Sequence, residues 1–207
     1  MILRTSRLVL CLMLPLLGAC VMLERAPTTL SCDPDLAGRW IPLASDDARN
    51  PLGRDDYAQV DAQCRVTLVD DKHMSERPSF TARGFRVGDA RYIALSQADM
   101  RELFNDRSPP KPSDIPESAV LPVKYRFVGD VIELDLADLE YVQDLVARGE
   151  LKALKLNALV VQGEDQALLA LLAEHPAMFD PEAPLPGGVS PSRDSYRFRL
   201  RRTGPAP

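Results

Sequence analysis

Hydrophobic and polar residues alternate in several stretches of the chain, which is typical of strands with one buried face and one face in water. Two such stretches, residues 123–127 and 132–136, flank Gly129-Asp130, and another two, residues 80–87 and 91–96, flank Gly88-Asp89. A Gly-Asp pair between alternating stretches indicates a tight turn. Further strands are predicted at 35–43, 64–68, 154–160 and 196–200, and residues 44–62 are predicted to form a loop.

Three other stretches carry apolar residues at helical spacing and predict helices over 97–104, 138–148 and 164–174. Asp138 is expected to cap the second helix and Gly149 to end it. Pro176 is expected to end the third. Two proline-rich loops are predicted over 106–121 and 180–194, and each is either a binding loop or an unstructured connection.

These elements predict a β-rich α+β fold, an antiparallel curled sheet or barrel of about eight strands with about three packed helices. A sheet of this size can close around packed side chains or around one small ligand. The sequence leaves that choice open, because it does not show how the side-chain volumes add up.

The N-terminal residues have the features of an export signal. Arg4 and Arg7 precede an apolar run over 8–17, which is too short to span a bilayer as a helix. The run ends in Leu17-Gly18-Ala19-Cys20, which resembles the lipobox of bacterial lipoproteins. The resemblance implies removal of residues 1–19, a diacylglycerol on the Cys20 thiol, and membrane attachment through this lipid. The alternative is an ordinary secreted protein cut after Ala19, with Cys20 free.

The residue after the lipobox is Val21 and not Asp. By the rule for enteric-type lipoproteins, the absence of Asp implies attachment to the outer membrane, with the domain facing the periplasm. Residues 20–31 are predicted to form a lipidated tether, and 32–207 a single globular β-rich domain. Two cysteines, Cys32 and Cys64, remain in an oxidising compartment and predict a disulfide. A metal or catalytic thiol pair is the alternative, but no Cys-x-x-Cys spacing supports it.

The charge of the chain argues against nucleic acid as a partner. Removal of residues 1–19 takes away Arg4 and Arg7 and changes the formal net charge from −5 to −7. The remaining chain has no long basic run, whereas nucleic-acid binding requires a basic face.

Two resemblances concern the domain itself. Gly38-Arg39-Trp40 resembles the Gly-x-Trp motif of lipocalins, which implies that Trp40 closes one barrel end under an arginine of the last strand, Arg199 or Arg201. The order of elements from Phe80 to Leu200 resembles a group of uncharacterised bacterial exported proteins. This likeness includes Phe85-Arg86-Val87-Gly88-Asp89, Tyr92-Ile93-Ala94-Leu95 and Asp138-Leu139-Glu140-Tyr141, and it implies fold and location but no activity.

The sequence contains no catalytic constellation, so we expect neither an enzyme nor a cofactor. His73 is expected to lie in a solvated turn beside Asp70 and Asp71, because a zinc site needs three or four ligands in suitable geometry. His175 is expected to cap a helix C-terminus. No Gly-x-Ser-x-Gly elbow or phosphate-binding glycine loop is present.

Two functional hypotheses remain. The first is a non-enzymatic envelope lipoprotein that acts through contacts with an envelope protein partner. The second is a lipocalin-like carrier of a small apolar ligand or lipid, whose pocket or barrel end would include Trp40, Tyr125 and Phe127. The alternating aromatic residues either fill the core or line such a pocket.

Overall fold

The computed structural model describes residues 20–43, 56–70, 75–76, 80–103, 114–156, 158–180 and 197–204. Several sequence-based predictions fall outside these residues, namely those for the export signal 1–19, for His73, for Tyr196 and for most of the two proline-rich loops.

The described residues form fourteen short strands that join into one sheet. The continuous path through it runs β12-β13-β1-β10-β11-β14-β3-β4-β5-β6, with β9 also paired to β10, β8 to β9, β2 to β8, and β7 to β5. The bounds of the strands are β1 Val21–Leu23, β2 Ser31–Cys32, β3 Gly38–Pro42, β4 Asp56–Val60, β5 Arg65–Asp70, β6 Ser75–Glu76, β7 Phe80–Thr81, β8 Arg83–Val87, β9 Ala90–Ser96, β10 Val120–Val128, β11 Val131–Leu136, β12 Ala153–Lys155, β13 Leu159–Val161 and β14 Arg197–Arg202.

Three α-helices accompany the sheet, as predicted, within the described part of the chain. They are α1 (Gln97–Leu103), α2 (Leu139–Ala147) and α3 (Asp165–Glu174), with short 3-10 helices η2 (Pro34–Leu36) and η3 (Pro176–Phe179). The Asp138 carboxylate accepts a hydrogen bond from the Tyr141 backbone N–H at 2.8 Å, so the predicted N-cap of α2 is confirmed. Gly149 ends this helix with a φ of 75°, a conformation that glycine adopts at little cost.

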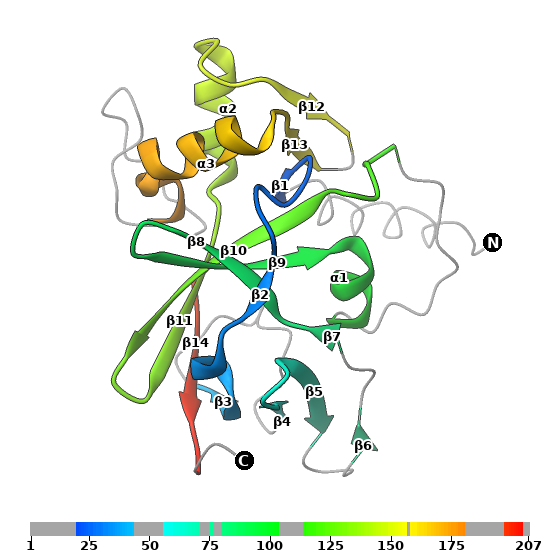
Figure 1. Cartoon of the computed structure of the whole chain (residues 1–207), viewed down its shortest axis with the longest axis vertical. Helices are drawn as coiled ribbons and strands as arrows, with labels where there is room; N and C mark the ends of the chain where they lie inside the picture. The colour runs from blue at the N-terminus through cyan, green and yellow to red at the C-terminus, as the bar shows by residue number, and fades with distance from the viewer. Residues whose placement is uncertain are drawn as a thin grey trace, which may run out of the picture.

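The sheet curls into a half-barrel, so the predicted β-rich α+β class is confirmed (Figure 1). Its two faces are covered differently. On β9, Tyr92 and Ala94 join one buried cluster with residues of α2, α3 and η3, whereas Ile93 and Leu95 pack on the opposite face. In Figure 1, α2 and α3 lie at the top of the molecule and β3, β4, β5 and β14 in its lower half. The helices therefore cover the first face, and the curled sheet encloses the second.

Three strand predictions are corrected by the structure. The single strand expected over 80–87 is two strands, β7, which pairs with β5, and β8, which pairs with β2 and β9. The single strand expected over 154–160 is two strands, β12 and β13, which pair antiparallel after a reversal in which the Leu156 N–H donates to the Ala158 carbonyl oxygen at 2.9 Å. The loop expected over 44–62 contains β4, in which Ala58 and Val60 are buried. Alanine contributes little to a hydrophobic pattern, so the alternation in β4 is weak in the sequence.

The tether predicted over 20–31 is also wrong in its first part. Val21–Leu23 forms β1, which pairs parallel with β13 and antiparallel with β10, and its three side chains are at most 1% exposed. All three residues are apolar and both faces of the strand are covered, so their burial holds β1 in the sheet. Residues 21–23 therefore belong to the folded body and not to a tether.

The predicted disulfide is present. Cys32 at the end of β2 is bonded to Cys64, the residue before β5, and their Cα atoms are 5.6 Å apart. Cys64 is fully buried, with apolar neighbours that include Leu36 and Trp40. The bond thus ties the N-terminal segment to the half-barrel.

Replacing both cysteines, with Cys32→Ser and Cys64→Ala, is expected to lower the free energy of unfolding by about 3–4 kcal/mol, the loop-closure value for this spacing. Alanine avoids placing a hydroxyl at the buried position. The measurement is urea unfolding, and reduction of the unmodified protein should produce a similar loss. A change below about 1 kcal/mol would contradict the prediction.

Candidate functional site

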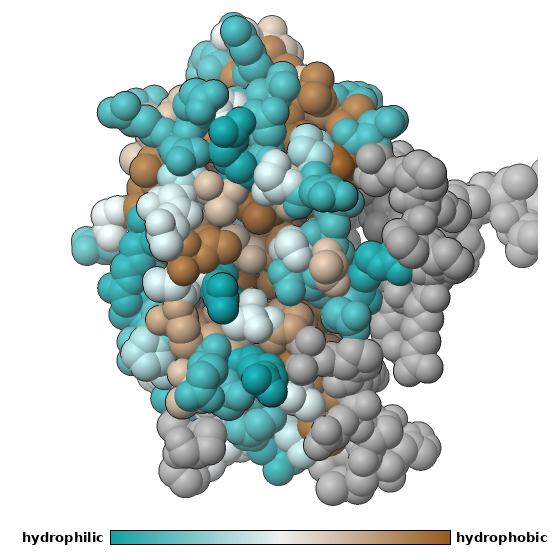
Figure 2. All heavy atoms as spheres, turned by 45° about the vertical axis from the view of Figure 1, so that its right-hand side comes forward, coloured by the Kyte–Doolittle hydropathy of each residue, from teal (hydrophilic) through white to brown (hydrophobic). Residues whose placement is uncertain are grey.

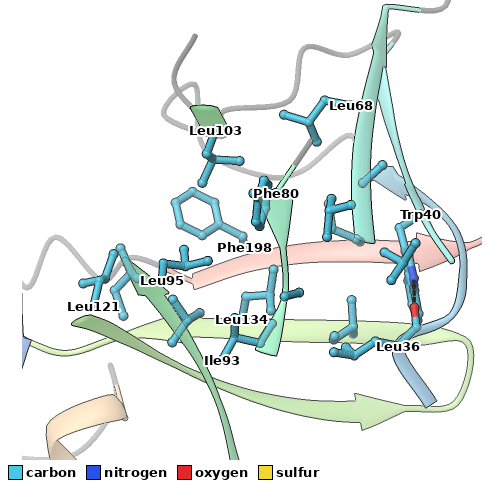
Figure 3. A pocket seen from close by; sticks show the side chains of 18 residues that line it. Leu36, Trp40, Leu68, Phe80, Ile93, Leu95, Leu103, Leu121, Leu134 and Phe198 are labelled. Atoms are coloured by element: carbon cyan, nitrogen blue, oxygen red, sulfur yellow. Dashed lines mark hydrogen bonds between the residues drawn. The ribbon is translucent and has the colours of Figure 1, made fainter. Parts of the chain in front are cut away.

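An apolar pocket lies inside the curl of the sheet, on the face opposite α2 and α3. Its walls follow from the alternation along the strands, because residues two apart point to the same face. Ile132, Leu134 and Leu136 of β11 line it together, and so do Phe198 and Leu200 of β14. Similar pairs come from β4, β5, β9 and β10, and Leu103 of α1 adds to the wall (Figure 3).

The lining of this pocket is uniform in chemistry. All eighteen lining residues are apolar: Leu36, Trp40, Ala58, Val60, Val66, Leu68, Phe80, Ala82, Ile93, Leu95, Leu103, Leu121, Val123, Ile132, Leu134, Leu136, Phe198 and Leu200. The indole N–H of Trp40 donates to the Leu36 carbonyl oxygen at 2.8 Å, so this polar atom is already satisfied. The pocket is partly open and has a volume of about 180 Å³.

One end of the pocket is formed by Trp40, as the likeness to the Gly-x-Trp motif implies, but the arginine above it is Arg202. The Arg202 guanidinium carbon lies 4.6 Å from the centre of the indole ring, and Arg202 faces Trp40 in the pairing of β14 with β3. Arg202 also donates a hydrogen bond to the Asp35 carbonyl oxygen. The prediction that Arg199 or Arg201 would stack on Trp40 is therefore wrong.

The alternation of β14 explains this correction. Phe198, Leu200 and Arg202 point to the inner face, which places Arg197, Arg199 and Arg201 on the outer face. There Arg197 Nε donates to Asp135 at 2.6 Å, and Arg199 Nε to Glu133 at 3.1 Å. Arg201 lies 3.6 Å from Asp130. Arg197 and Arg199 thus form cross-strand ion pairs with β11, and Arg201 pairs with the turn before β11, all away from the pocket.

Tyr125 and Phe127 lie next to this end and not in the lining of the pocket. The Phe127 ring stacks on Trp40, with ring centres 6.1 Å apart, and meets Tyr125 edge to face. The Tyr125 hydroxyl donates to Asp33 Oδ2 at 2.6 Å. Arg91 Nη1 donates to Asp33 Oδ2 at 3.2 Å and to Asp35 Oδ2 at 2.9 Å. A polar network therefore holds the segment of η2 against β9 and β10.

The ionisation of this network follows from its contacts. Burial by itself raises the pKa of Asp33, but the hydrogen bonds from Tyr125 and from the Asp35 backbone, together with Arg91 and Arg86, outweigh it and leave this pKa below its ordinary value. Burial and then the hydrogen bond to Asp33 raise the pKa of Tyr125. Asp33 is thus a carboxylate at neutral pH and accepts from a neutral phenol.

Cys20 lies beside the lining of the pocket and is not part of it. Its side chain packs against the cluster of Leu95, Leu121 and Val123, three residues that line the pocket. Burial raises the pKa of the Cys20 thiol. In Figure 3, Leu95 and Leu121 lie at one end of the pocket and Trp40 and Leu36 at the other.

The remaining polar candidate is the one histidine among the described residues, His175, which caps a helix as predicted. His175 is the C-cap of α3, where its backbone N–H donates to the Leu171 carbonyl oxygen, and its Nδ1 lies 3.4 Å from the Tyr141 hydroxyl. Among the residues described by the structure, no three His, Cys, Asp or Glu side chains are grouped so as to hold a metal ion. Within the same residues, no helix has the length and apolar character needed to cross a membrane.

Tyr125→Phe is expected to lower the free energy of unfolding by about 1–3 kcal/mol at pH 7, because it removes a hydrogen bond to the half-buried carboxylate of Asp33. The pKa of Asp33 is lower in the folded protein than its value of about 3.9 in the unfolded chain, so the contacts of its carboxylate stabilise the fold above about pH 3.9. This stabilisation is lost as the pH falls through the folded-state pKa and the carboxylate is protonated. The difference between the variant and the unmodified protein should therefore shrink in acid. Urea unfolding at pH 7 and near pH 3 measures it.

Tyr92→Phe is the matched control for this prediction. Tyr92 is 1% exposed and its hydroxyl has no hydrogen-bond partner among the described residues, so loss of this oxygen should be neutral or stabilising. Equal destabilisation by the two variants would show that the Tyr125–Asp33 contact contributes nothing of its own.

Arg202→Met is expected to destabilise the fold by about 1–2 kcal/mol and to shift the fluorescence of Trp40, since it removes a cation from the face of the indole. Trp40 is the single tryptophan of the chain. Arg201→Met should change stability by less than about 1 kcal/mol, because the ion pair of Arg201 is exposed. A shift of the Trp40 emission by Arg201→Met but not by Arg202→Met would contradict this assignment.

Comparison with known proteins assigns the chain to no family. The chain matches no protein-family model, no curated protein and no solved structure. The resemblances to lipocalins and to exported lipoproteins stay predictions from the sequence. What the protein does is therefore argued from the pocket and its surroundings.

Proposed function

We propose that this chain is a non-enzymatic, lipid-anchored envelope protein whose pocket binds one narrow apolar group, such as part of an acyl chain. The observation that supports this proposal is the lining, in which all eighteen residues are apolar and the indole N–H is already bonded. Such a lining favours an apolar molecule over water, because it offers water no hydrogen-bond partner.

The size of the pocket limits the ligand. At about 180 Å³ it is smaller than the roughly 300–1,000 Å³ of ordinary ligand pockets, and close to the volume of about 150 Å³ in which an engineered apolar cavity binds benzene. This favours a short stretch of a hydrocarbon chain over a bulky ring system. Each methylene transferred from water into the pocket contributes about 0.8 kcal/mol, so about six of them contribute about 5 kcal/mol.

The anchor and the location belong to the same proposal. The lipobox Leu17-Gly18-Ala19-Cys20 supports a lipid on Cys20, and Val21 supports attachment to the outer membrane with the domain in the periplasm. The disulfide between Cys32 and Cys64 is consistent with an oxidising compartment.

Action through contacts with an envelope protein stays a prediction. Two large hydrophobic side chains are well exposed among the described residues, Val128 at 54% and Leu154 at 40%, and they lie on separate strands. On the face drawn in Figure 2, hydrophobic residues lie between hydrophilic ones. The pocket brings eighteen apolar residues together, whereas the two exposed hydrophobic residues lie apart, so we favour the binding of an apolar group over a protein contact.

Ligand binding is tested on residues 20–207 with Cys20→Ala, exported behind an ordinary cleavable signal and purified without detergent. We expect native mass spectrometry to detect a co-purified apolar molecule, or one added decanoate per chain, that leaves on unfolding. The emission of Trp40 should shift on saturable addition of decanoate, because Trp40 forms one end of the pocket.

Pocket-filling variants supply the control. Leu134→Phe and, separately, Val66→Phe place extra carbon atoms in the pocket and should weaken decanoate binding at least tenfold, about 1.4 kcal/mol. Val128→Phe adds similar bulk at an exposed position of β10 and should leave binding unchanged. Equal loss in all three variants, or no binding by the unmodified pocket, would refute the proposed function.

A further inference from the structure

We infer that the occupant of the pocket is an acyl chain carried by Cys20 of the same molecule. This inference rests on the proposed function, since it needs the pocket to accept a hydrocarbon chain. It goes further by naming the occupant and its source, and by assigning the protein a state in which part of its own membrane anchor is enclosed.

The first observation is that Cys20 is fixed in position. The Leu159 N–H donates to the Cys20 carbonyl oxygen at 3.0 Å, and β1 follows at once, paired with β13 on one edge and with β10 on the other. Both faces of β1 are covered, Val21 and Leu23 by one cluster and Met22 by another. Cys20 therefore cannot move away from the body unless β1 leaves the sheet.

The second observation is where this fixed residue lies. The Cys20 side chain packs against the cluster formed by Leu95, Leu121 and Val123, and all three of these residues also line the pocket. Leu103, from α1, belongs both to the partly buried neighbours of this cluster and to the pocket wall. A diacylglycerol on the Cys20 sulfur would thus place its acyl chains beside the apolar cluster that continues into the pocket.

The third observation is the direction of the pocket. Leu95 and Leu121 lie at the end of the pocket away from Trp40 (Figure 3), and Arg202 covers Trp40 at that other end. A chain entering beside Cys20 would run past Leu134 and Phe198 toward the indole. A chain carried on the same molecule has a very high effective concentration at this entrance, which favours it over a free lipid.

The pocket holds only part of a long acyl chain, because its volume corresponds to a short hydrocarbon segment. The remainder, and any other chain on Cys20, would stay outside. Enclosure of one segment reduces the apolar area of the anchor in contact with water, which is useful to a lipidated protein that is not yet inserted in a membrane.

The test is photo-crosslinking of the lipidated protein. The full chain is produced in a lipidating bacterial host that is fed a fatty acid with a diazirine near its terminal carbon, and intact mass identifies the product with the labelled lipid on Cys20. After irradiation at high dilution, we expect intramolecular crosslinks to peptides that contain Leu103, Leu134 or Phe198. Leu134→Phe should reduce the pocket crosslinks at least threefold, whereas Val128→Phe should not.

The outcomes separate the two proposals. Crosslinks confined to detergent, to added lipid or to residues outside the pocket would overturn the inference, and so would an intact mass without lipid on Cys20. The proposed binding of an apolar group would survive these results if the Cys20→Ala chain still binds decanoate, whereas a Cys20 without lipid would also refute the proposed anchor. The lipidated chain should bind decanoate at least tenfold more weakly than the Cys20→Ala chain, and equal binding would count against an occupant in the same molecule.

Discussion

The structure depends on one constraint, which is that the first half of β10, Val120 to Val123, buries both of its faces. It pairs with β9 along one edge and with β11 and β1 along the other, so it joins the two parts of the sheet. Side chains on one face of this region pack under α2 and α3, and those on the other face need a second cover. The sheet supplies that cover by curling until β4, β5 and β14 lie opposite β9, β10 and β11 around the pocket.

The parts of the fold that could be predicted are those in which a local pattern determines the outcome. The two hairpins at Gly88 and Gly129, the three α-helices, the cap at Asp138 and the disulfide follow from residues close in sequence or from cysteine counting. The position of Arg202 over Trp40 could also have been predicted, because the alternation that points Phe198 and Leu200 inward includes Arg202 and excludes Arg199 and Arg201.

The rest depends on long-range contacts that no local pattern encodes. Tyr125 and Asp33 are ninety-two residues apart, and nothing in the sequence pairs them. Three apolar residues after a lipobox are as compatible with a linker as with β1, and the parallel pairing with β13 decides between them. Whether inward side chains fill the half-barrel or leave a pocket depends on their summed volumes against the curvature of the sheet.

The apolar pocket affects the stability of the fold, and β1 determines which residue lies beside that pocket. When nothing fills the pocket, its apolar wall side chains lack packing partners on one side, which costs the fold dispersion energy. A hydrocarbon chain in the pocket offsets this cost, and its binding stabilises the fold by mass action. Because β1 fixes Cys20 beside the pocket, a lipid on Cys20 would couple occupation of the pocket to the state of the anchor.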